Sequence, residues 1–477
     1  MKPRVNPART LLILGAGGDL TARLLLPGLG GLVAAGGVTD LRLVGSGIDD
    51  WDDARWRDRV SESFAAAEAG GPAVAGLVRE TRYAKADVTD AGDLRALLDG
   101  CEEPIVIYFA LPPAVTEKAC RALAEIGVPA STRLVMEKPF GSDVASARSL
   151  NELLTGLVSE DHVHRVDHFL GMSTVLNIVG LRFANRIFEP VLSNQHVATV
   201  DVTFDETLGL EGRAGYYDEA GALIDMIQSH LLQVLSLAAM EAPPTLSADD
   251  LRDRRAEVLR ATRIWRDDPL ASSRRARYTA GSLAGRRLPS YADERGVDPD
   301  RKTETLAEMV VGVNTWRWAG VPFRLRSGKA IGSPRQEVTI TFRQPPQIPV
   351  GFTGCERPDR LRIAIAPGAG ELCLEINVNG PGDPIQLDPT DLVAGFGAGE
   401  LPEYGEVLKG VLNGDPTLSV RGDMAEECWR IVAPVLAAWR SDRVGLDEYE
   451  AGGPGPGNWP SSGLGGPEAA NLVTEDV

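Results

Sequence analysis

TLLILGAGGDLTARLLLPGL, residues 10–29, sets the architecture of the N-terminal part of this 477-residue chain. Its continuous apolar run at 10–14 is typical of a strand that is buried on both faces, as in a parallel sheet. A glycine-rich turn follows, and leucines then recur at helical spacing from Leu20 to Leu32. Such a turn lets a pyrophosphate approach the backbone at a helix N-terminus. The residues of this turn are therefore candidate contacts for a dinucleotide cofactor: Gly15, Ala16, Gly17, Gly18, Asp19 and Leu20. A tight turn without a ligand is the alternative, because Leu20 stands where the third glycine of G-x-G-x-x-G would be.

The alternation of strand and helix continues after this opening. Further short apolar runs lie at 41–44, 105–110 and 133–136, and the stretches between them are long enough for helices. Repetition of this kind predicts a doubly wound parallel sheet. We therefore expect a Rossmann-like dinucleotide-binding domain over residues 1–170.

The pattern changes after this first domain. Apolar and polar residues alternate, as in antiparallel strands with one wet face, at 197–204, 336–342 and 360–365. An apolar stretch at 220–240 predicts a long buried helix. The expected fold class is α/β plus α+β, with a larger α+β domain on a mostly antiparallel sheet over 171–455. A Gly/Pro-rich C-terminal arm is expected over 456–477.

Composition and charge exclude several kinds of partner. The formal net charge of -18 argues against nucleic acid and anionic membranes, which bind to basic surfaces. No run approaches the roughly 20 apolar residues that span a bilayer, so we expect a cytoplasmic protein. The 5 cysteines lack C-x-x-C spacing, which argues against a disulfide framework or a zinc site. His162 and His164 share a strand face without a third ligand motif, and we predict no metal.

Two polar motifs lie in the last third of the predicted first domain. EKPFG at 137–141 places Lys138 at the carboxyl end of a parallel strand, which is the edge where doubly wound sheets bind ligands. A solvated lysine at a strand end is the alternative. RVDHFLG at 165–171 supplies Asp167 and His168, which would point to opposite faces if this stretch is extended.

A third polar motif lies in the predicted apolar helix. DMIQSHLL at 225–232 contains Asp225 and His230. Five residues correspond to an offset of about 140° on an α-helix, so these two side chains are not expected to stack. His230 is either a core histidine or a general base; the second role needs a buried carboxylate from elsewhere in the chain to hold its ring.

In this order and spacing, the motifs resemble those of the glucose-6-phosphate dehydrogenase family along nearly the whole chain. The other matching stretches are YFALPP (108–113), LRFANRIFEP (181–190), EGRAGYYDEAGALIDMIQSHLLQ (211–233), GVDPDRKTETLAEM (296–309), VPFRLRSGKA (321–330) and RGDMAEECWRIVAP (421–434). The resemblance implies the two-domain fold expected above and a homodimer or homotetramer. It also implies oxidation of glucose 6-phosphate at C1 to 6-phosphoglucono-1,5-lactone with NAD or NADP, the first oxidative step of the pentose phosphate pathway.

The resemblance also implies roles for individual residues. His230 would take the proton from the C1 hydroxyl while hydride leaves C1 for the nicotinamide. Asp167 would hold the imidazole in the required tautomer, and Lys138 would lie between cofactor and sugar. The remaining substrate contacts implied are His168 on the 6-phosphate, Glu206 and Asp225 as acceptors for sugar hydroxyls, and Lys329 as a further sugar contact.

The chain departs from the family pattern at the sugar phosphate. The family motif around His168 continues with a lysine that binds the phosphate, and Met172 stands there in this chain. A second basic position, after the glycine turn, is Leu24. Each lost charge-assisted hydrogen bond would cost about 1.5–3 kcal/mol, unless arginines such as Arg23 or Arg165 compensate.

The chain also departs from the family pattern at the residues expected to bind the cofactor ribose. NADP-using members carry an arginine followed by Ser or Thr after the second strand, where this chain has Ile48 and Asp49. An aspartate at that strand end suits a free ribose 2′-hydroxyl and repels a 2′-phosphate, which favours NAD. The alternative is that Asp49 only opens the acidic, helix-capping run at 49–53.

Two other functions stay open from the sequence. The altered phosphate contacts are compatible with a dehydrogenase of the same fold that acts on a different sugar or sugar phosphate. A catalytically silent regulatory paralogue is the other, although such a protein has no need to retain Asp167, His230 and Lys138 together.

Overall fold

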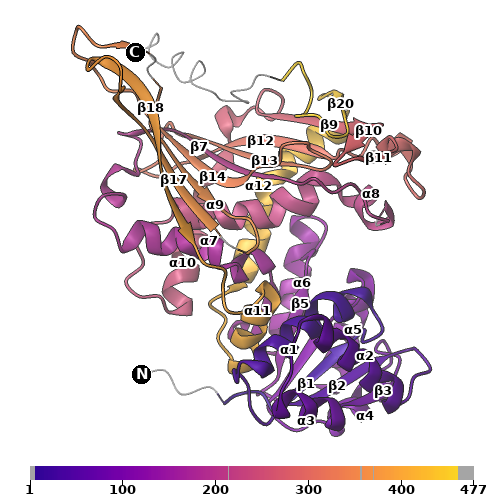
Figure 1. Cartoon of the computed structure of the whole chain (residues 1–477). Coiled ribbons are helices and arrows are strands. Elements are labelled where there is room, and N and C mark those ends of the chain that lie inside the picture. The colour runs from indigo at the N-terminus through magenta and orange to yellow at the C-terminus, as the bar shows by residue number, and fades with distance from the viewer. Residues whose placement is uncertain (1–5, 213, 355–356, 369, 460–477) are drawn as a thin grey trace. The chain divides into compact units, whose positions relative to one another are not determined.

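A computed structural model describes residues 6–459, apart from 213, 355–356 and 369 (Figure 1). The chain forms two compact units. The first comprises residues 1–173 with two later segments, 243–253 and 399–429, and the second comprises the rest. Most of the predicted arm at 456–477 lies outside the described residues.

The first unit is built on a seven-stranded sheet in the order β19-β6-β5-β4-β1-β2-β3 (Figure 1). Its strands are β1 (Thr10–Leu14), β2 (Arg42–Gly47), β3 (Arg82–Lys85), β4 (Ile105–Phe109), β5 (Arg133–Glu137), β6 (Val163–Val166) and β19 (Ser419–Val420). All neighbours pair in parallel except β19, which is antiparallel to β6. The strand order reverses between β1 and β4, and such a switch point is where doubly wound sheets bind ligands. The predicted parallel sheet is confirmed.

The helices of this unit form two groups, and the helices within a group contact one another. One group consists of α1 (Leu26–Ala34), α2 (Asp53–Ala66), α3 (Pro72–Glu80) and α11 (Glu403–Asn413), and the other of α4 (Ala91–Asp99), α5 (Pro113–Ile126) and α6 (Val144–Leu157). Side chains cap several N-termini; Asp52, for example, accepts a hydrogen bond from the Arg55 N–H before α2. The apolar faces of α1, α2 and α11 share one core with Leu11 and Ile13 of the first strand.

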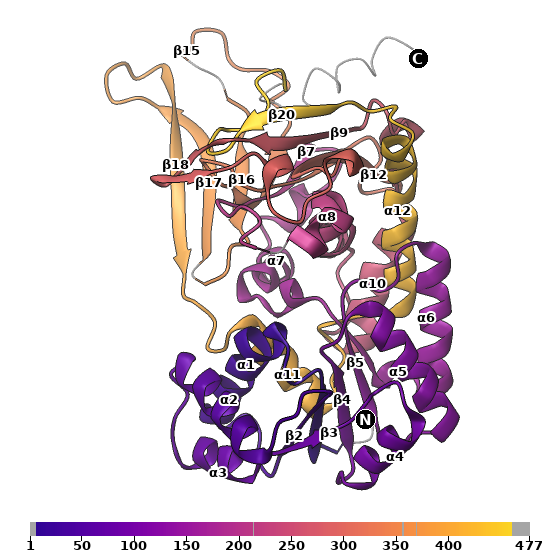
Figure 2. The same cartoon turned by 90° about the vertical axis from the view of Figure 1, so that its right-hand side faces the viewer.

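The second unit is built on an eleven-stranded sheet in the order β15-β18-β17-β16-β14-β7-β13-β12-β9-β20, with β8 paired to β12 (Figure 2). The main strands are β7 (Val197–Asp205), β8 (Thr262–Ile264), β9 (Ser273–Thr279), β12 (Leu306–Val313), β13 (Pro322–Gly328), β14 (Gln336–Phe342), β15 (Thr353–Gly354), β16 (Arg360–Ala364), β17 (Gly370–Asn379), β18 (Gln386–Phe396) and β20 (Leu446–Glu450). Most pairs are antiparallel, as predicted, but β7 with β13, β9 with β20 and β15 with β18 are parallel. A separate hairpin joins β10 (Gly281–Leu283) and β11 (Arg286–Leu288).

The predicted apolar helix consists of three consecutive parts: α8 (Ala214–Ala222), the π-helix η5 (Leu223–Leu231) and α9 (Leu232–Ala239). By length and composition this helix could cross a membrane, which the sequence analysis did not anticipate, but 89% of its most apolar window is buried inside the protein. It is a core helix that contacts β7, β12 and β13 through η5. The chain also contains helices α7 (Ser173–Phe183), α10 (Ala248–Ala261) and α12 (Gly422–Arg440).

Candidate active site

The glycine turn lies at the carboxyl end of β1, between β2 and β4. Gly15 has φ +92°, and a Cβ there would come 2.1 Å from the carbonyl oxygen of Ala110, so only glycine fits. The N–H groups of Gly15 and Ala16 donate to Ser46 O at 2.9 and 3.0 Å, and Gly18 N–H donates to Gly15 O at 3.0 Å. These bonds hold the predicted cofactor-binding turn at the switch point of the sheet.

Asp49 lies against this turn. A Cβ on Gly17 would be 2.2 Å from Asp49 Oδ2, so the glycine makes room for the carboxylate. The Tyr83 hydroxyl donates to the backbone oxygen of Asp49 at 3.2 Å. Burial, together with the charge of Asp49, raises the pKa of Tyr83 to about 12.

An arginine and a tryptophan that the sequence analysis missed complete this region. Arg59 Nη2 donates to Gly17 O at 2.8 Å and to Gly18 O at 3.2 Å. Its guanidinium lies over the Trp51 ring, 5.6 Å from the centroid. Arg59 follows Arg55 by one helical turn, and both lie over Trp51, so this spacing in the sequence was a usable signal.

Lys138 follows β5 directly, and the peptide bond between Lys138 and Pro139 is cis. The preceding residue, Glu137, accepts a hydrogen bond from the Tyr108 hydroxyl and another from Tyr404. Burial raises the pKa of Glu137 to about 7, although the hydrogen bonds and Lys138 oppose the rise. A protonatable carboxyl group therefore lies directly beside the predicted Lys138.

Asp167 and His168 do not continue strand β6, so the extended conformation on which opposite strand faces depended is absent at these two residues. The strand β6 ends at Val166, and the Asp167 carboxylate accepts the N–H of Phe169 at 3.1 Å as the cap of a short 3-10 turn. Asp167 is 1% exposed. The hydrogen bond from a following N–H favours the turn over extension, as it does at helix N-termini.

Tyr404 of α11 contacts both Glu137 and His168. Its ring stacks on His168 at 5.9 Å with an interplanar angle of 16°. Burial and the charges of Glu137 and Asp167 raise the pKa of Tyr404, so its hydroxyl stays protonated. Because Tyr404 is more than 200 residues from His168 in sequence, no local motif could have indicated this contact.

In the second unit, two predicted sugar contacts lie side by side. Asp205 of β7 is in register with Gly328 of β13, and the two strands run parallel. The next residues, Glu206 and Lys329, therefore leave the same edge of the sheet, and Lys329 Nζ lies 2.7 Å from Glu206 Oε2. Lys329 Nζ also lies 5.1 Å from the centroid of the Tyr217 ring.

His230 is 1% exposed and lies on the π-helix η5. The offset predicted from α-helical geometry is wrong, because in a π-helix hydrogen bonds join residues five apart and so bring them to nearly the same face. Asp225 and His230 are such a pair. The Tyr216 hydroxyl donates to Asp225 at 3.5 Å.

The structure thus groups the predicted residues into two sets. Gly15 to Leu20, Asp49, Lys138, Asp167 and His168 belong to the first unit; Glu206, Asp225, His230 and Lys329 belong to the second. Within each unit the members are placed by adjacent strand ends or by one helix. The predicted pairing of Asp167 with His230 joins the two sets and stays a prediction.

Metal ligation is a separate question. His164 is buried, its Nδ1 lies 3.0 Å from Ser419 Oγ, and burial with nearby arginines lowers its pKa to about 3. Within the described part of the chain, one group could hold a metal by distance alone: Cys373, Glu375 and Asp391. Glu375 is already paired with Arg362 at 2.8 Å, and we assign no metal to this group.

Comparison with known proteins extends over both units. Residues 12–177 match the family model of the glucose-6-phosphate dehydrogenase NAD binding domain, and residues 179–461 match that of the C-terminal domain. This chain belongs to the glucose-6-phosphate dehydrogenase family. Glucose-6-phosphate 1-dehydrogenases of Dickeya dadantii and Gluconobacter oxydans are 36% and 38% identical to it; the alignments cover 94% and 93% of this chain and 94% of each relative.

Solved structures agree with this membership of the glucose-6-phosphate dehydrogenase family. The glucose-6-phosphate 1-dehydrogenase of Mycobacterium avium has a TM-score of 0.82 at 31% identity, covering 98% of this chain and 96% of that one. A glucose-6-phosphate dehydrogenase in complex with its substrate glucose 6-phosphate has a TM-score of 0.84 at 27% identity, covering 96% and 97%.

The two departures from the family pattern differ in their surroundings. Met172 is 3% exposed, whereas Leu24 is 46% exposed. Arg165 is buried and holds Glu160 through both guanidinium nitrogens, at 2.7 and 3.2 Å, so it is not available to replace a phosphate-binding lysine. Arg23 is exposed and pairs with Asp19 at 3.4 Å, which leaves its charge accessible to a ligand.

Proposed function

We propose that this protein oxidises glucose 6-phosphate at C1 to 6-phosphoglucono-1,5-lactone, with hydride transfer to a nicotinamide dinucleotide. The observation that carries the proposal is the second unit's polar cluster: the Lys329–Glu206 pair at adjacent strand ends, beside the buried helix with Asp225 and His230. A family member solved with glucose 6-phosphate, which matches almost the full chain, supports the same substrate.

In the proposed reaction, the C1–H bond supplies a hydride and the C1 hydroxyl supplies a proton, which leaves a C1 carbonyl in the lactone. His230 accepts that proton as the general base. Asp167 holds the imidazole tautomer and stabilises the cation that forms. Glu206, Asp225 and Lys329 orient the sugar ring, and Lys138 lies between the sugar and the cofactor. When bound, the nicotinamide supplies the hydride acceptor.

An isotope experiment tests this chemistry. Incubation with [1-²H]glucose 6-phosphate and NAD or NADP should give singly deuterated reduced nicotinamide and 6-phosphogluconate after lactone hydrolysis, both measured by mass spectrometry. Absence of deuterium from the nicotinamide product would contradict hydride transfer from C1.

We propose NAD as the preferred cofactor. The Asp49 carboxylate lies against Gly17 of the turn, where a negative charge accepts a hydrogen bond from a 2′-hydroxyl and repels a 2′-phosphate. Arg55 and Arg59, near Trp51, are the opposing features, because arginines there could attract a phosphate. The ratio of kcat/KM for NAD to that for NADP decides between them.

A second candidate function is oxidation of a different sugar or sugar phosphate by the same chemistry. The buried Met172 and the engaged Arg165 support it, because both weaken the case for a strong phosphate site. In that case activity on another aldose should exceed activity on glucose 6-phosphate. A protein that bound the sugar without turnover would instead be the silent paralogue.

We further propose a cytoplasmic homodimer or homotetramer acting in the pentose phosphate pathway. Exposed apolar side chains on the long strand β18, Leu392 at 53% and Val393 at 58% exposure, support self-association. Light scattering coupled to size-exclusion chromatography should give a mass of at least twice 50.9 kDa. A monomer at micromolar concentration would contradict this assignment.

A further inference from the structure

Glu304, which the proposed mechanism does not use, holds the start of the helix that carries His230. Gly221 has φ +66° and interrupts the helix before it, so Ala222 and Leu223 begin a new helical segment whose first N–H groups have no intrahelical acceptor. Glu304 Oε1 accepts the Leu223 N–H at 2.9 Å, and the Glu304 backbone oxygen accepts the Ala222 N–H at 3.2 Å. One residue therefore satisfies both donors.

Gly221 and Glu304 fit each other closely. A Cβ on Gly221 would lie 2.4 Å from Glu304 Oε1 and 2.7 Å from its Cδ. Residue 221 must therefore be glycine both for its backbone conformation and for the carboxylate beside it. Glu304 is 7% exposed, so its side chain has little freedom to move away.

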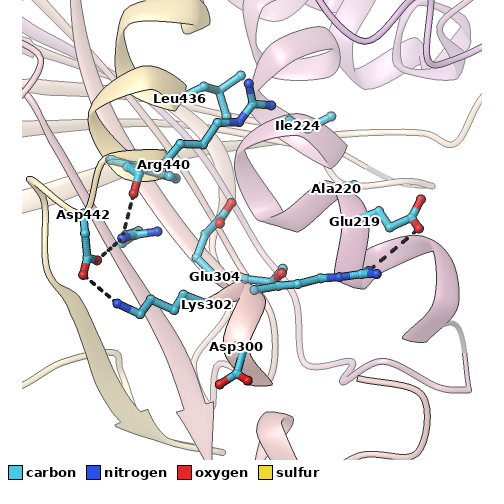
Figure 3. Close-up of a pocket in the computed structure, with 13 residues that line it drawn as sticks. Glu219, Ala220, Ile224, Asp300, Lys302, Glu304, Leu436, Arg440 and Asp442 are labelled. Atoms are coloured by element: carbon cyan, nitrogen blue, oxygen red, sulfur yellow. Dashed lines mark hydrogen bonds and ion pairs between the residues drawn. The ribbon is translucent and has the colours of Figure 1, made fainter. Parts of the chain in front are cut away.

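Glu304 also lines a pocket of about 330 Å³ within the second unit (Figure 3). The charged groups that line this pocket with it come from four elements: Glu219 of α8, Arg275 of β9, Asp300, Arg301 and Lys302 around the turn at 299–301, and Arg440 and Asp442 at the end of α12. The buried hydroxyls of Tyr217 and Tyr291 also lie within the electrostatic reach of Glu304.

Most of these charges are already paired with one another. Asp442 binds Lys302 at 2.6 Å and Arg275 at 3.3 Å, and Arg301 lies 3.8 Å from Glu219. The other charges that line the pocket therefore largely neutralise one another. Burial raises the pKa of Glu304 to about 7, while the Leu223 N–H and Arg275 oppose the rise.

We propose that Glu304 is a positioning residue, which fixes the first turn of η5 and thereby the imidazole of His230 for proton transfer. This inference rests on the proposed function for its kinetic consequence. An ionised carboxylate is a stronger acceptor than a neutral one, and negative charge favours a helix N-terminus. Ionisation of Glu304 therefore tightens the first turn, and kcat should contain a component that rises through about pH 7.

The kinetic test compares Glu304→Gln and Glu304→Ala with the wild type over pH 5.5–9. The glutamine keeps an oxygen acceptor for the Leu223 N–H but cannot ionise, so kcat should stay within about three-fold while the component near pH 7 disappears. The alanine removes the acceptor, and kcat should fall at least about ten-fold with a smaller change in KM, as expected when a catalytic group is displaced. Glu219→Gln and Glu219→Ala, in the same pocket, are the matched controls and should leave both unchanged.

Hydrogen exchange gives a second readout that does not need turnover. Amides of the segment 222–231 should lose protection at least about ten-fold in Glu304→Ala and recover it in Glu304→Gln, by mass spectrometry. If wild-type protein does not oxidise glucose 6-phosphate, the proposed function fails, and the exchange result alone decides whether Glu304 holds the helix. If exchange and kcat are both unchanged in Glu304→Ala, or if exchange rises while kcat and its pH profile stay the same, the positioning role is overturned.

Discussion

At the scale of single residues, His230 has the central role in the proposed reaction, as the group that accepts the proton. It is nearly fully buried on a short π-helix, a geometry that is rare and frequently found at functional sites. Asp225 lies one hydrogen-bonding step earlier on the same helix. The proposed division of labour assigns proton transfer to His230 and orientation of the sugar to Asp225.

Replacement of His230 by asparagine should lower kcat by at least about 100-fold, because general-base catalysis contributes about 10²–10⁴-fold. Steady-state assays at saturating substrate measure this change. The matched control is His196→Asn, an exposed histidine in a loop, which should keep full activity. A fall of less than about ten-fold in His230→Asn would mean that another group accepts the proton.

Replacement of Asp49 by serine should raise the ratio of kcat/KM for NADP to that for NAD by at least about ten-fold. The removed carboxylate repels a 2′-phosphate, and the change leaves Arg55 and Arg59 to attract it. Asp50→Ser is the control, because Asp50 pairs with Lys85 at 3.1 Å away from the glycine turn. An unchanged ratio in Asp49→Ser would remove the argument for NAD.

At the scale of elements, the glycine turn after β1 depends on close backbone approach. Gly15→Ala should destabilise the protein by several kcal/mol, since the left-handed conformation costs about 1–2 kcal/mol and the Cβ would also meet Ala110 O at 2.1 Å. Gly127 has φ +74° and ψ 158°, a backbone region almost restricted to glycine, but nothing lies within 4 Å of its Cβ position, so Gly127→Ala carries the backbone cost alone and should cost about 1–3 kcal/mol. Urea unfolding measures both; equal costs would contradict the steric argument.

Glu137, the last residue of β5, should make the free energy of unfolding depend on pH. The pKa of Glu137 is raised from an ordinary 4.5 to about 7, so the folded state binds this proton more tightly than the unfolded state. Glu137 therefore adds to the free energy of unfolding below pH 4.5, and this stabilisation is lost as the pH rises to about 7. Each unit of difference between the folded and unfolded pKa corresponds to about 1.4 kcal/mol of that free energy. Glu304 acts in the same direction.

Glu137→Gln should therefore flatten the decline in unfolding free energy between pH 5 and pH 7.5, measured by urea denaturation. Glu103→Gln, at an exposed site in the same unit, is the matched control and should keep the wild-type slope. Identical slopes in wild type and Glu137→Gln would show that Glu137 does not titrate in this range.

Elements with a regular pattern could be predicted, and those with buried charges could not. The apolar run of β1 and the alternation in β7 and β14 indicated strands directly. In β12 and β13, buried Glu308, Arg324 and Arg326 break the apolar pattern, yet they are accommodated by ion pairs such as Arg326 with Asp205 at 3.1 Å. Those partners are distant in sequence, which explains why both strands were missed.

The same distinction applies to the candidate site. Sequence motifs indicated Lys138, Asp167 and His230 as candidates because each lies in a contiguous signature. The turn at Asp167 and the π-helix under His230 changed the expected geometry, since both depend on local hydrogen bonds that periodicity does not encode. Tyr404 and Glu304 were missed because only folding brings them to His168 and Leu223.

At the scale of the whole molecule, an acidic chain must bind two anionic small molecules. The net charge of -18 repels them at a distance, so affinity has to come from local donors at the glycine turn and the sugar site. Met172 is buried and uncharged, and Arg165 is held by Glu160, so neither side chain supplies a positive charge to the sugar phosphate.

The most direct measurement is kcat/KM for glucose 6-phosphate against unphosphorylated glucose, each with saturating NAD. We expect at least about a hundred-fold preference for glucose 6-phosphate, which corresponds to the free energy of about two charge-assisted hydrogen bonds to the phosphate. A preference for glucose, or no turnover of glucose 6-phosphate, would contradict the assigned substrate while leaving the fold and the family unaffected.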